Sequence, residues 1–467
     1  MLFSSITFLY YFLPGVLIVY FMMPKKHKNL VLLFSSLVFY GWGEPRYVAV
    51  MLASVAAQFV LGLAIERNLG TKRAKVWVFA SVLFSLSLLG YFKYTDFFIA
   101  NFNALTGFSV PLLRVALPIG ISFYTFQILS YTIDVYRGDT KAQRSFIDLA
   151  TYIALFPQLI AGPIVRYADV QAALSERTHS VQRVQTGLRR FLAGLGKKVL
   201  IANSLGELCA LFAGTNQETI LFAWMYAVAF SLQIYFDFSG YSDMAIGLGR
   251  ILGFDYMENF DYPYTSKSIT EFWRRWHMSL GTWFRDYLYI PLGGNRVTAK
   301  RMLFNILVVW ILTGFWHGAA WNFVVWGLLF ACLLIFEKFW LGERLEAMPA
   351  AFSHIYVLLV VVVSFVLFDA PSLAEALRRI GLMAGCGGVP LYDVASLYYL
   401  KSFGVTLVLA AIGSGPWVKR AVGRAYGHVT SNRTLIFLEP LFCTAILALV
   451  TAYLVDSSFN PFLYFRF

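Results

Sequence analysis

The stretch LVVWILTGFWHGAAWNFVVWG, residues 307–327, decides the class of fold to which this chain belongs. It lies inside a longer segment, 302–336, that contains no Asp, Glu, Lys or Arg. A helix needs about 20 apolar residues to cross the hydrocarbon core of a bilayer. The segment therefore predicts two membrane-embedded helices, 302–316 and 320–336, on either side of His317.

The rest of the chain has the same apolar character. Of its 467 residues, 59% are hydrophobic and only 13% are charged, whereas a soluble domain carries about 25% charged residues. Further apolar runs follow one another along the chain at 2–24, 29–43, 47–65, 76–91, 117–133, 149–165, 199–213, 220–236, 355–368, 402–413 and 434–455. This composition excludes a water-soluble protein. It predicts an all-α integral membrane protein, a multi-span helical bundle in which residues 1–467 form a single domain.

Several of the apolar runs are interrupted by proline and glycine. Examples are LPIGISFYTF (117–126) and LFPQLIAGPI (155–164). Broken helices at membrane depth are tolerated where they are buried in protein or line a cavity. We therefore expect broken or re-entrant helices around a central tunnel. The alternative interpretation is that these are kinked helices with a packing role only.

The distribution of charge predicts the orientation of the chain. The formal net charge is +13, and cytoplasmic loops of membrane proteins carry an excess of Lys and Arg. Placing the basic loops 25–28 and 66–75 in the cytoplasm makes the N-terminus extracytoplasmic, and the basic loop 419–424 does the same for the C-terminus. Because the basic residues lie near span ends, we expect contacts with membrane lipids and no nucleic-acid partner.

The segment 268–292, SITEFWRRWHMSLGTWFRDYLYIPL, differs from the spans. At about 100° per residue, its Trp, Phe, Tyr and Leu side chains share one arc, and its arginines fall outside that arc. The pattern predicts one amphipathic helix that lies in the membrane interface or re-enters the membrane. His277 falls near the edge of the apolar arc.

Two histidines lie among the tryptophans of the central region. Ionisable residues at membrane depth are costly and are therefore site candidates. Burial favours the neutral imidazole, which accepts a proton, so His317 is a candidate general base and His277 a second candidate. A lone buried histidine with a purely structural role is the alternative. Metal binding by the pair is less favoured, because no HExxH motif or suitably spaced carboxylate accompanies them.

A third cluster, LQIYFDFSGYSDMAIGLG (232–249), contains two carboxylates in an otherwise uncharged stretch. Asp237 and Asp243 line a polar entry, pair with arginines or cap broken helices; the sequence leaves these alternatives open.

Three long motifs, taken in order, resemble a known family. They are QIYFDFSGYSDMAIGLG (233–249), SITEFWRRWHMSLGTWFRDYLYIPLGGNR (268–296) and LTGFWHGAAWNFVVWG (312–327). They look like the membrane-bound O-acyltransferase (MBOAT) family, in particular its bacterial polysaccharide branch, typified by the alginate O-acetyltransferase membrane subunit. The core motifs cover 115–330, and the C-terminal spans and tail, 355–467, resemble the family more loosely.

The resemblance implies a function and roles for particular residues. On the family pattern His317 is the essential histidine and His277 is its partner. Tunnel or entry-lining positions would be Asp237, Ser239, Trp316 and Asn322. The acyl donor would be cytoplasmic acetyl-CoA, without a metal, and the cytoplasmic basic residues Lys25, Lys26, Arg73 and Lys75 are candidates for attracting its phosphates.

The terminal sequence FLYFRF (462–467) resembles an aromatic C-terminal motif of acyl-export systems. The resemblance suggests that Tyr464 accepts the acyl group in the tunnel and passes it to an extracytoplasmic SGNH-type acetyltransferase or other glycan-modifying protein. The alternative is that these aromatic residues only anchor the last span at the interface.

The function expected from the resemblance is O-acetylation of an exported polysaccharide, alginate-like or cellulose-like, by a multi-pass protein of the bacterial inner membrane. Peptidoglycan O-acetylation and D-alanyl export are alternatives within the same chemistry. A transporter of a lipid-linked glycan or acyl carrier is an alternative from another class. Intramembrane polar residues fit a transporter, but the chain shows no internal repeat.

Overall fold

The computed structural model of the chain describes residues 1–160, 162–214, 218–429, 434–456 and 462–463, without the side chains of 425–437. Every regular element in these residues is a helix. The predicted all-α fold is therefore confirmed. The physical reason is that a helix satisfies its backbone hydrogen bonds within one segment, as hydrocarbon surroundings demand. The chain divides into two compact units, and each is described by itself.

The first unit contains residues 1–191 and 242–257. Its helices are η1 (Phe8–Phe12), α1 (Leu13–Met22), η2 (Lys25–His27), α2 (Lys28–Gly41), α3 (Pro45–Arg67), α4 (Lys72–Leu89), η3 (Gly90–Tyr94), α5 (Thr95–Thr106), α6 (Ile121–Arg137), α7 (Phe146–Ala154), α8 (Phe156–Leu159), α9 (Tyr167–Ser175) and most of α10 (Val181–Gly196).

The second unit contains residues 192–241 and 258–467. Its helices are η4 (Lys197–Ala202), α11 (Asn203–Gly214), α12 (Ile220–Leu252), η5 (Pro263–Thr265), α13 (Ile269–Arg275), α14 (Met278–Phe284), η6 (Arg285–Tyr289), α15 (Ala299–His317), α16 (Trp321–Phe336), η7 (Glu337–Leu341), α17 (Gly342–Ala347), α18 (Ala350–Asp369), α19 (Leu373–Met383), α20 (Val394–Gly413), α21 (Trp417–Val429) and α22 (Thr434–Asp456). The end of α12 belongs to the first unit.

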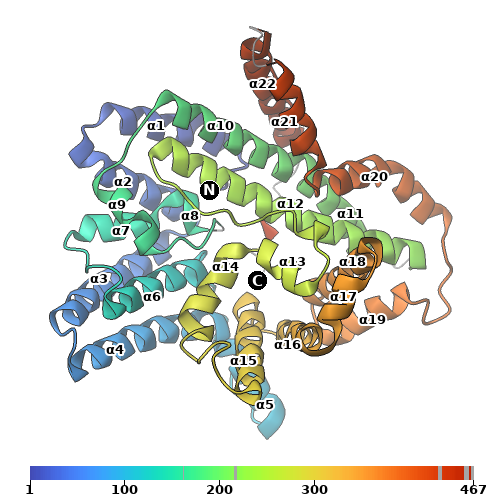
Figure 1. Cartoon of the computed structure of the whole chain (residues 1–467), viewed down its shortest axis with the longest axis horizontal. Coiled ribbons are helices and arrows are strands. Elements are labelled where there is room, and N and C mark those ends of the chain that lie inside the picture. Colours follow the sequence, from blue (N-terminus) through green and yellow to red (C-terminus); the bar gives the residue numbers. More distant parts are fainter. Residues whose placement is uncertain (161, 215–217, 430–433, 457–461, 464–467) are drawn as a thin grey trace. The chain divides into compact units, whose positions relative to one another are not determined.

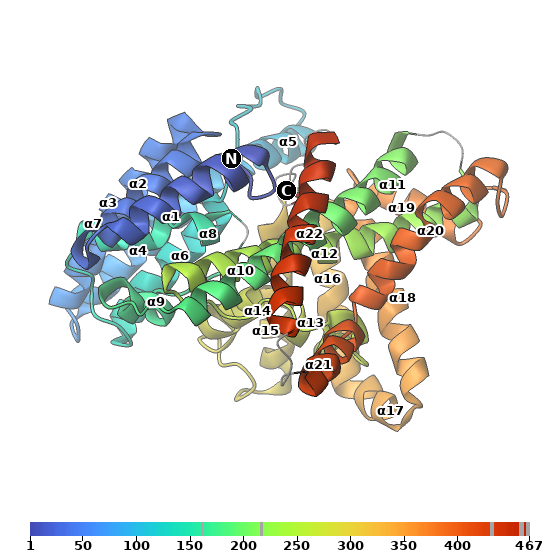
Figure 2. The same cartoon turned by 90° about the horizontal axis from the view of Figure 1, so that it is seen from above.

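Eight helical segments in the described part of the chain are long and apolar enough to cross a membrane. They are Pro45–Arg67, Lys72–Thr106, Ile220–Leu252, Ala299–His317, Trp321–Ala347, Ala350–Asp369, Val394–Gly413 and Leu438–Asp456, and Phe8–Met22 is a shorter apolar helical run. These segments confirm the predicted multi-span protein. The basic helix α21 lies between the last two spans in chain order (Figure 2).

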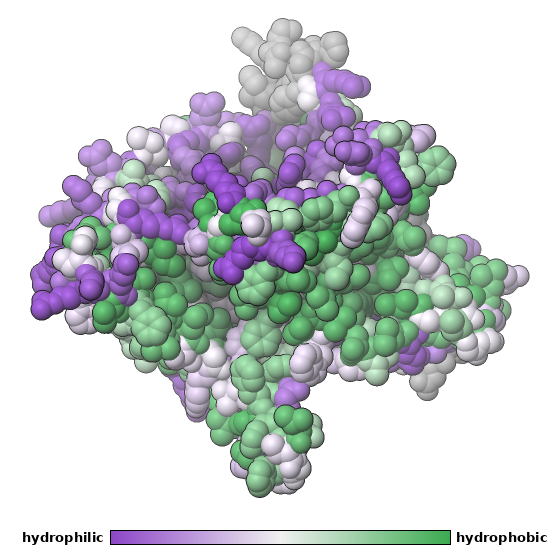
Figure 3. All heavy atoms as spheres, turned by 60° about the horizontal axis from the view of Figure 1, so that its bottom comes forward, coloured by the Kyte–Doolittle hydropathy of each residue, from purple (hydrophilic) through white to green (hydrophobic). Residues whose placement is uncertain are grey.

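Exposed apolar side chains are the second mark of a membrane protein. They cover much of the face shown in Figure 3. In the second unit, only 11% of the most apolar window of α20 and 6% of that of α22 are buried inside the protein. In water such surfaces would drive aggregation, whereas lipid chains cover them at no such cost.

The predicted interruptions of the apolar runs occur at prolines. Helix α7 ends at Ala154 and α8 begins at Phe156, with Pro157 in its first turn. Gly120, which precedes α6, has φ +76°, and a Cβ there would lie 2.6 Å from the carbonyl oxygen of Leu159. Only glycine fits this combination of conformation and close contact.

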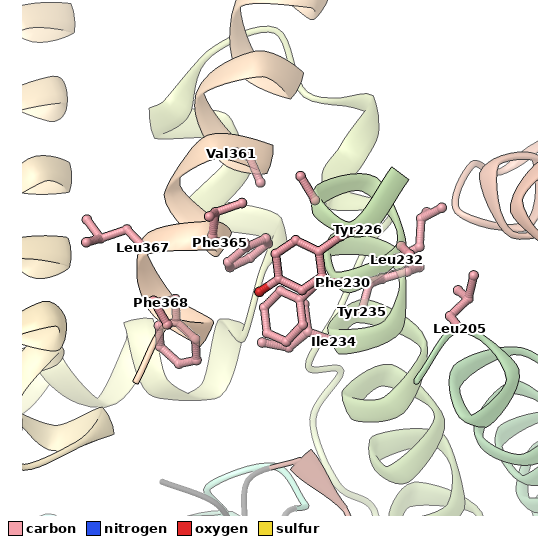
Figure 4. Packing of buried hydrophobic residues seen from close by; sticks show 14 of the residues in the cluster. Leu205, Tyr226, Phe230, Leu232, Ile234, Tyr235, Val361, Phe365, Leu367 and Phe368 are labelled. Atoms are coloured by element: carbon pink, nitrogen blue, oxygen red, sulfur yellow. The ribbon is translucent and has the colours of Figure 1, made fainter. Parts of the chain in front are cut away.

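The core of the second unit is built on α12. Tyr226, Phe230 and Tyr235 of α12 pack with Phe365 and Phe368 of α18 in one buried aromatic cluster (Figure 4). Buried aromatic side chains make many dispersion contacts, so this cluster fixes α18 against the part of α12 that leads into the motif 233–249.

The prediction of one continuous amphipathic helix over 268–292 was wrong. Helix α13 ends at Arg275, and α14 begins at Met278 (Figure 1). The loop before α13 forms hydrogen bonds with backbone groups that a continuous helix would pair internally. The N–H of Asp261 donates to Arg275 O at 2.9 Å, and the N–H of Met278 donates to Asn259 O at 2.9 Å. His277 lies in this break.

Candidate active site

His317 is the last residue of α15, at the turn of a closely packed helical hairpin. Gly318, which follows it, is extended, and α16 begins at Trp321. The two helices approach through glycines: a Cβ on Gly314 would lie 2.2 Å from Phe323 O, and one on Gly327 would lie 2.3 Å from Trp310 O. Small residues allow helix backbones to approach closely in membranes, so these glycines set the position of the turn.

Aromatic rings surround the His317 imidazole, which is only 5% exposed. The centroid of the imidazole lies 4.9 Å from Trp316, 5.3 Å from Trp326 and 5.2 Å from Phe368. The last two rings meet the imidazole nearly edge to face, at 84° and 79°. The imidazole of His317 therefore lies in an apolar, aromatic environment.

His277 is held by a hydrogen-bonded loop. Its Nδ1 lies 3.1 Å from Asn259 Oδ1, which also accepts the Ser279 N–H at 3.3 Å and the Ser279 hydroxyl at 2.9 Å. Because a backbone N–H can only donate, the Asn259 atom is an oxygen, and the Nδ1 of a neutral His277 carries the proton. The Nε2 atom is therefore the nitrogen with the lone pair, the form that a general base requires.

The backbone and the burial of His277 are both unusual. Its φ is +44°, a left-handed conformation that non-glycine residues seldom adopt. The residue lies outside the spans, between α12 and α15, and is 2% exposed. Burial lowers the pKa of His277 to about 3, so the ring stays neutral near pH 7. A strained conformation kept at a buried titratable residue is typical of functional sites.

Trp316 connects the two imidazoles. Its ring centroid lies 6.2 Å from His277 and 4.9 Å from His317. Phe238 of α12 meets His277 from another side, with centroids 4.5 Å apart and an interplanar angle of 85°. Residues from the motif 233–249, the α13–α14 break and the α15–α16 hairpin thus meet at one place in the second unit.

The other predicted lining residues fall in different environments. Asp237 and Ser239 flank Phe238 on α12 and are buried, with 1% and 3% of their surface exposed. The Ser239 hydroxyl has no hydrogen-bond partner among the described residues. Asn322 instead closes the end of α18, since its Nδ2 donates to the carbonyl oxygen of Ala370 at 3.0 Å. That contact satisfies a carbonyl that a helix end leaves without an intrahelical partner.

The two carboxylates of the 232–249 cluster are paired with basic side chains. Asp243 pairs with Arg190 at 2.8 Å in the first unit, as one of the open alternatives predicted. Asp237 pairs with Lys198 of η4 at 2.5 Å in the second unit. Its Oδ2 also accepts the backbone N–H of Leu463 at 2.8 Å. Tyr464, the next residue, lies outside the described part of the chain.

A cavity of about 920 Å³ leads to His277. Its inner wall carries Trp273, Trp276 and Trp310, and it extends along α15 as far as Thr313, one turn before His317, which is not among its lining residues. Its volume falls in the range of cofactor and substrate pockets.

The outer part of the cavity is charged. Lys267, Arg274, Arg285 and Lys338 line it together with four glutamates. Glu337 is committed elsewhere, since it accepts the N–H groups of Ile269 and Thr270 at the start of α13.

Lys267 and Arg274 are exposed and make no ion pair with any residue that the structure describes. They are candidates for an anionic ligand.

Sequence reasoning missed most of this cavity. The basic residues proposed for the donor phosphates, Lys25, Lys26, Arg73 and Lys75, are not among its lining residues. Arg274 and Arg285, which line the cavity, belong to the amphipathic segment 268–292 that the sequence singled out. No sequence pattern pointed to Asn259. Within the described residues, no group of three or more His, Cys, Asp or Glu side chains is placed to hold a metal ion.

Fold and site together define a polytopic membrane enzyme in which a ligand-sized cavity reaches the neutral imidazole of His277, with His317 beyond the cavity lining on α15. The chain belongs to the membrane-bound O-acyltransferase (MBOAT) family, whose model matches residues 73–376. It is therefore an O-acyltransferase.

Named relatives cover the whole chain. It is 38% identical to the probable alginate O-acetylase AlgI of Azotobacter vinelandii and 40% identical to that of Pseudomonas putida, with 100% of both chains covered in each case. It is 30% identical to the peptidoglycan O-acetyltransferase of Helicobacter pylori, over 100% of this chain and 98% of the relative.

Proposed function

We propose that this protein moves an acetyl group from cytoplasmic acetyl-CoA toward the hydroxyl groups of an exported, alginate-like polysaccharide. One observation carries the proposal: the cavity runs from exposed cations, Lys267 and Arg274, to the buried imidazole of His277. A ligand with phosphates at one end and a reactive thioester at the other fits this gradient. The relatives named for alginate O-acetylation, which cover the whole chain, support the substrate class.

The donor would lie with its charged part at the cavity mouth. Lys267 and Arg274 attract phosphates electrostatically, and the proposal places this mouth of the cavity on the cytoplasmic side. Tryptophans line the cavity together with His277, and in the proposal they keep water from the reacting end of the donor. Water exclusion protects a thioester from hydrolysis and strengthens electrostatic interactions with the reacting atoms.

In the proposed reaction His317 acts as general base and His277 as its partner. A neutral imidazole takes the proton of an acceptor hydroxyl, and the oxygen attacks the thioester carbonyl carbon. The tetrahedral intermediate collapses with cleavage of the C–S bond, and the coenzyme A sulfur leaves and is protonated by the imidazolium. Trp316, in contact with both rings, supports a shared role for the two histidines.

The first acceptor in this proposal is the phenol of Tyr464. Tyr464 itself lies outside the described residues, but Phe462 and Leu463, just before it, are buried in the second unit. An acetyl ester on Tyr464 would then be transferred to an extracytoplasmic SGNH-type acetyltransferase or other glycan-modifying protein. This step requires the C-terminus to be extracytoplasmic in a bacterial inner membrane, and the basic loops predict that side for both termini.

Peptidoglycan is the second candidate acceptor, because a relative named as a peptidoglycan O-acetyltransferase also matches the whole chain. The same site serves either polymer, since only the final acceptor differs. Export of D-alanyl groups remains a third alternative within the same chemistry.

The test uses cells that carry the complete polysaccharide machinery. His317→Ala should reduce acetylation of the exported polymer at least 100-fold, the lower range for loss of general base catalysis, without reducing export of the polymer. The matched control is His27→Ala, which removes an exposed histidine of η2 and should leave acetylation unchanged.

Four outcomes would each contradict a part of the assignment. Normal acetylation by a properly inserted His317→Ala variant would exclude His317 as the base. Loss of acetylation in His277→Ala alone would exchange the two roles. Normal acetylation in Tyr464→Phe would remove the relay while leaving the donor site intact, and reduced export of unmodified polymer would instead favour a transporter.

A further inference from the structure

The ion pair between Asp237 and Lys198 is buried beside the candidate active site. The two side chains are 1% and 6% exposed, and Lys198 Nζ lies 2.5 Å from Asp237 Oδ1. Burying both charges carries a large desolvation cost. The backbone permits the pair because a Cβ on Gly240 would lie 2.8 Å from Gly194 O and 3.2 Å from the Lys198 N atom, so α12 and the α10–η4 segment meet closely.

The second oxygen of Asp237 is used by the C-terminal tail. The N–H of Leu463 donates to Asp237 Oδ2 at 2.8 Å, between two residues 226 positions apart. The Phe462 ring packs on Phe238 and Tyr241, with centroids 5.9 and 5.1 Å away. Phe462 and Leu463 are 1% and 3% exposed, and both lie beyond the residues 73–376 that the family model matches.

These contacts connect the tail to the imidazole of His277. Phe238 touches Phe462 on one side and His277 on the other, where the centroids are 4.5 Å apart. One aromatic ring therefore separates the described end of the tail from the candidate active site. A carboxylate that receives a backbone N–H fixes the position of the chain itself and strengthens that bond by its charge.

We propose that Asp237, held by Lys198, is a positioning residue that seats the C-terminal tail of the protein beside His277. Lys198 occupies one carboxylate oxygen and fixes the rotamer, so the other oxygen meets the Leu463 N–H. Seating Leu463 sets the point from which the last four residues begin. The function of this seating rests on the proposed relay through Tyr464. The contact between Asp237 and the Leu463 N–H does not depend on that relay.

Substitutions at Leu463 separate seating from the stability that the buried pair gives the fold. Leu463→Pro removes the N–H donor and leaves Asp237 and Lys198 in place, whereas the matched control Leu463→Ala keeps the N–H. Seating is measured by a short thiol cross-linker between cysteines placed at Phe462 and Tyr241 in the full chain, with the four native cysteines replaced by serine. We expect Leu463→Pro to reduce the cross-linked fraction at least fivefold and Leu463→Ala to leave it within twofold.

The charge pair is tested by removal and by reversal in the same cross-linking background. Asp237→Asn should lower the cross-linked fraction at least threefold. The double variant Asp237→Lys, Lys198→Asp restores the ion pair that Asp237→Asn lacks, so the amount of protein in the membrane should also be restored. A lysine at residue 237 cannot accept the Leu463 N–H. The double variant should therefore remain as poorly cross-linked as Leu463→Pro. Recovery of cross-linking in the reversed pair, or normal cross-linking in Leu463→Pro, would overturn the seating role.

Acetylation measured in the same cells separates this inference from the proposed relay. Cross-linking that depends on Asp237, together with normal acetylation in Tyr464→Phe, supports seating and contradicts the relay. Lost acetylation in Tyr464→Phe, with cross-linking that is unchanged in Asp237→Asn, supports the relay and overturns the seating.

Discussion

Replacing Gly314 by alanine tests whether the packing of α15 on α16 sets the position of His317. A Cβ at residue 314 would lie 2.2 Å from the carbonyl oxygen of Phe323 and 3.1 Å from the Gly327 Cα. Real Cβ contacts essentially never fall below 3.0 Å, so the helices must separate by about 0.8 Å. The obstructing atoms belong to the backbone and cannot turn aside as a flexible side chain would.

The shift would reach the imidazole because His317 follows Gly314 by three residues on the same helix. Overpacking of this kind costs about 1–3 kcal/mol of stability, and a misplacement of about 1 Å at a catalytic group costs on the order of 100-fold in rate. We therefore expect Gly314→Ala to fold less stably and to lower the acetylation rate by about two orders of magnitude.

The assay measures acetyl groups per sugar in the exported polymer, normalised to the amount of variant in the membrane, together with the melting temperature in detergent. The control is Gly404→Ala on α20, where no atom lies within 4 Å of an added Cβ. That variant should match the parent in rate and gain up to about 1 kcal/mol, since alanine favours a helix interior. A Gly314→Ala variant with parental rate and melting temperature would refute the argument.

Three further predictions concern His277 and the cavity. Asn259→Ala removes the acceptor that fixes His277 Nδ1, so acetylation should fall about 10–100-fold; an unchanged rate would mean that the tautomer is set otherwise. Lys267→Ala with Arg274→Ala should raise KM for acetyl-CoA in membrane vesicles more than it lowers kcat, whereas Lys401→Ala, outside the cavity, should change neither. The pKa of His277 is depressed to about 3, so below pH 6.5 the unfolded state binds the extra proton. Because folded His277 does not bind that proton, the free energy of unfolding should fall by up to about 1.4 kcal/mol for each pH unit as the pH falls from 6.5 toward 3. In His277→Gln the melting temperature should fall less over pH 6.5–5, and an identical decline would contradict the assignment.

The two imidazoles are held in different ways, and this difference suggests different roles. Asn259 and Ser279 fix the orientation of His277 through hydrogen bonds. His317 is surrounded by aromatic rings at the end of a helix. An imidazole with a fixed tautomer at the cavity wall suits interaction with the donor, and one beyond it suits the acceptor side.

Much of the architecture was predictable because hydrocarbon imposes simple rules. Long uncharged runs such as 302–336 form helices because hydrocarbon leaves backbone groups no other partner, and Pro157 falls where one helix ends and the next begins. The break at His277 was not predictable, since periodicity in 268–292 continues through it. The break depends on backbone hydrogen bonds from Asn259 and Asp261, in a loop with no periodic pattern.

The sequence by itself determined the membrane class and the helical character of the long apolar runs, because burial in hydrocarbon makes both a local property of the chain. It also singled out the two histidines as candidate site residues. Only the tertiary structure decided which groups meet. It placed the cations of 267–274 on one cavity with His277, gave Asp237 a lysine partner and brought Leu463 to that carboxylate across 226 residues. The physical reason is that a hydrogen bond or an ion pair depends on the distance between two atoms in space, and spacing along the chain does not fix that distance between separate helices.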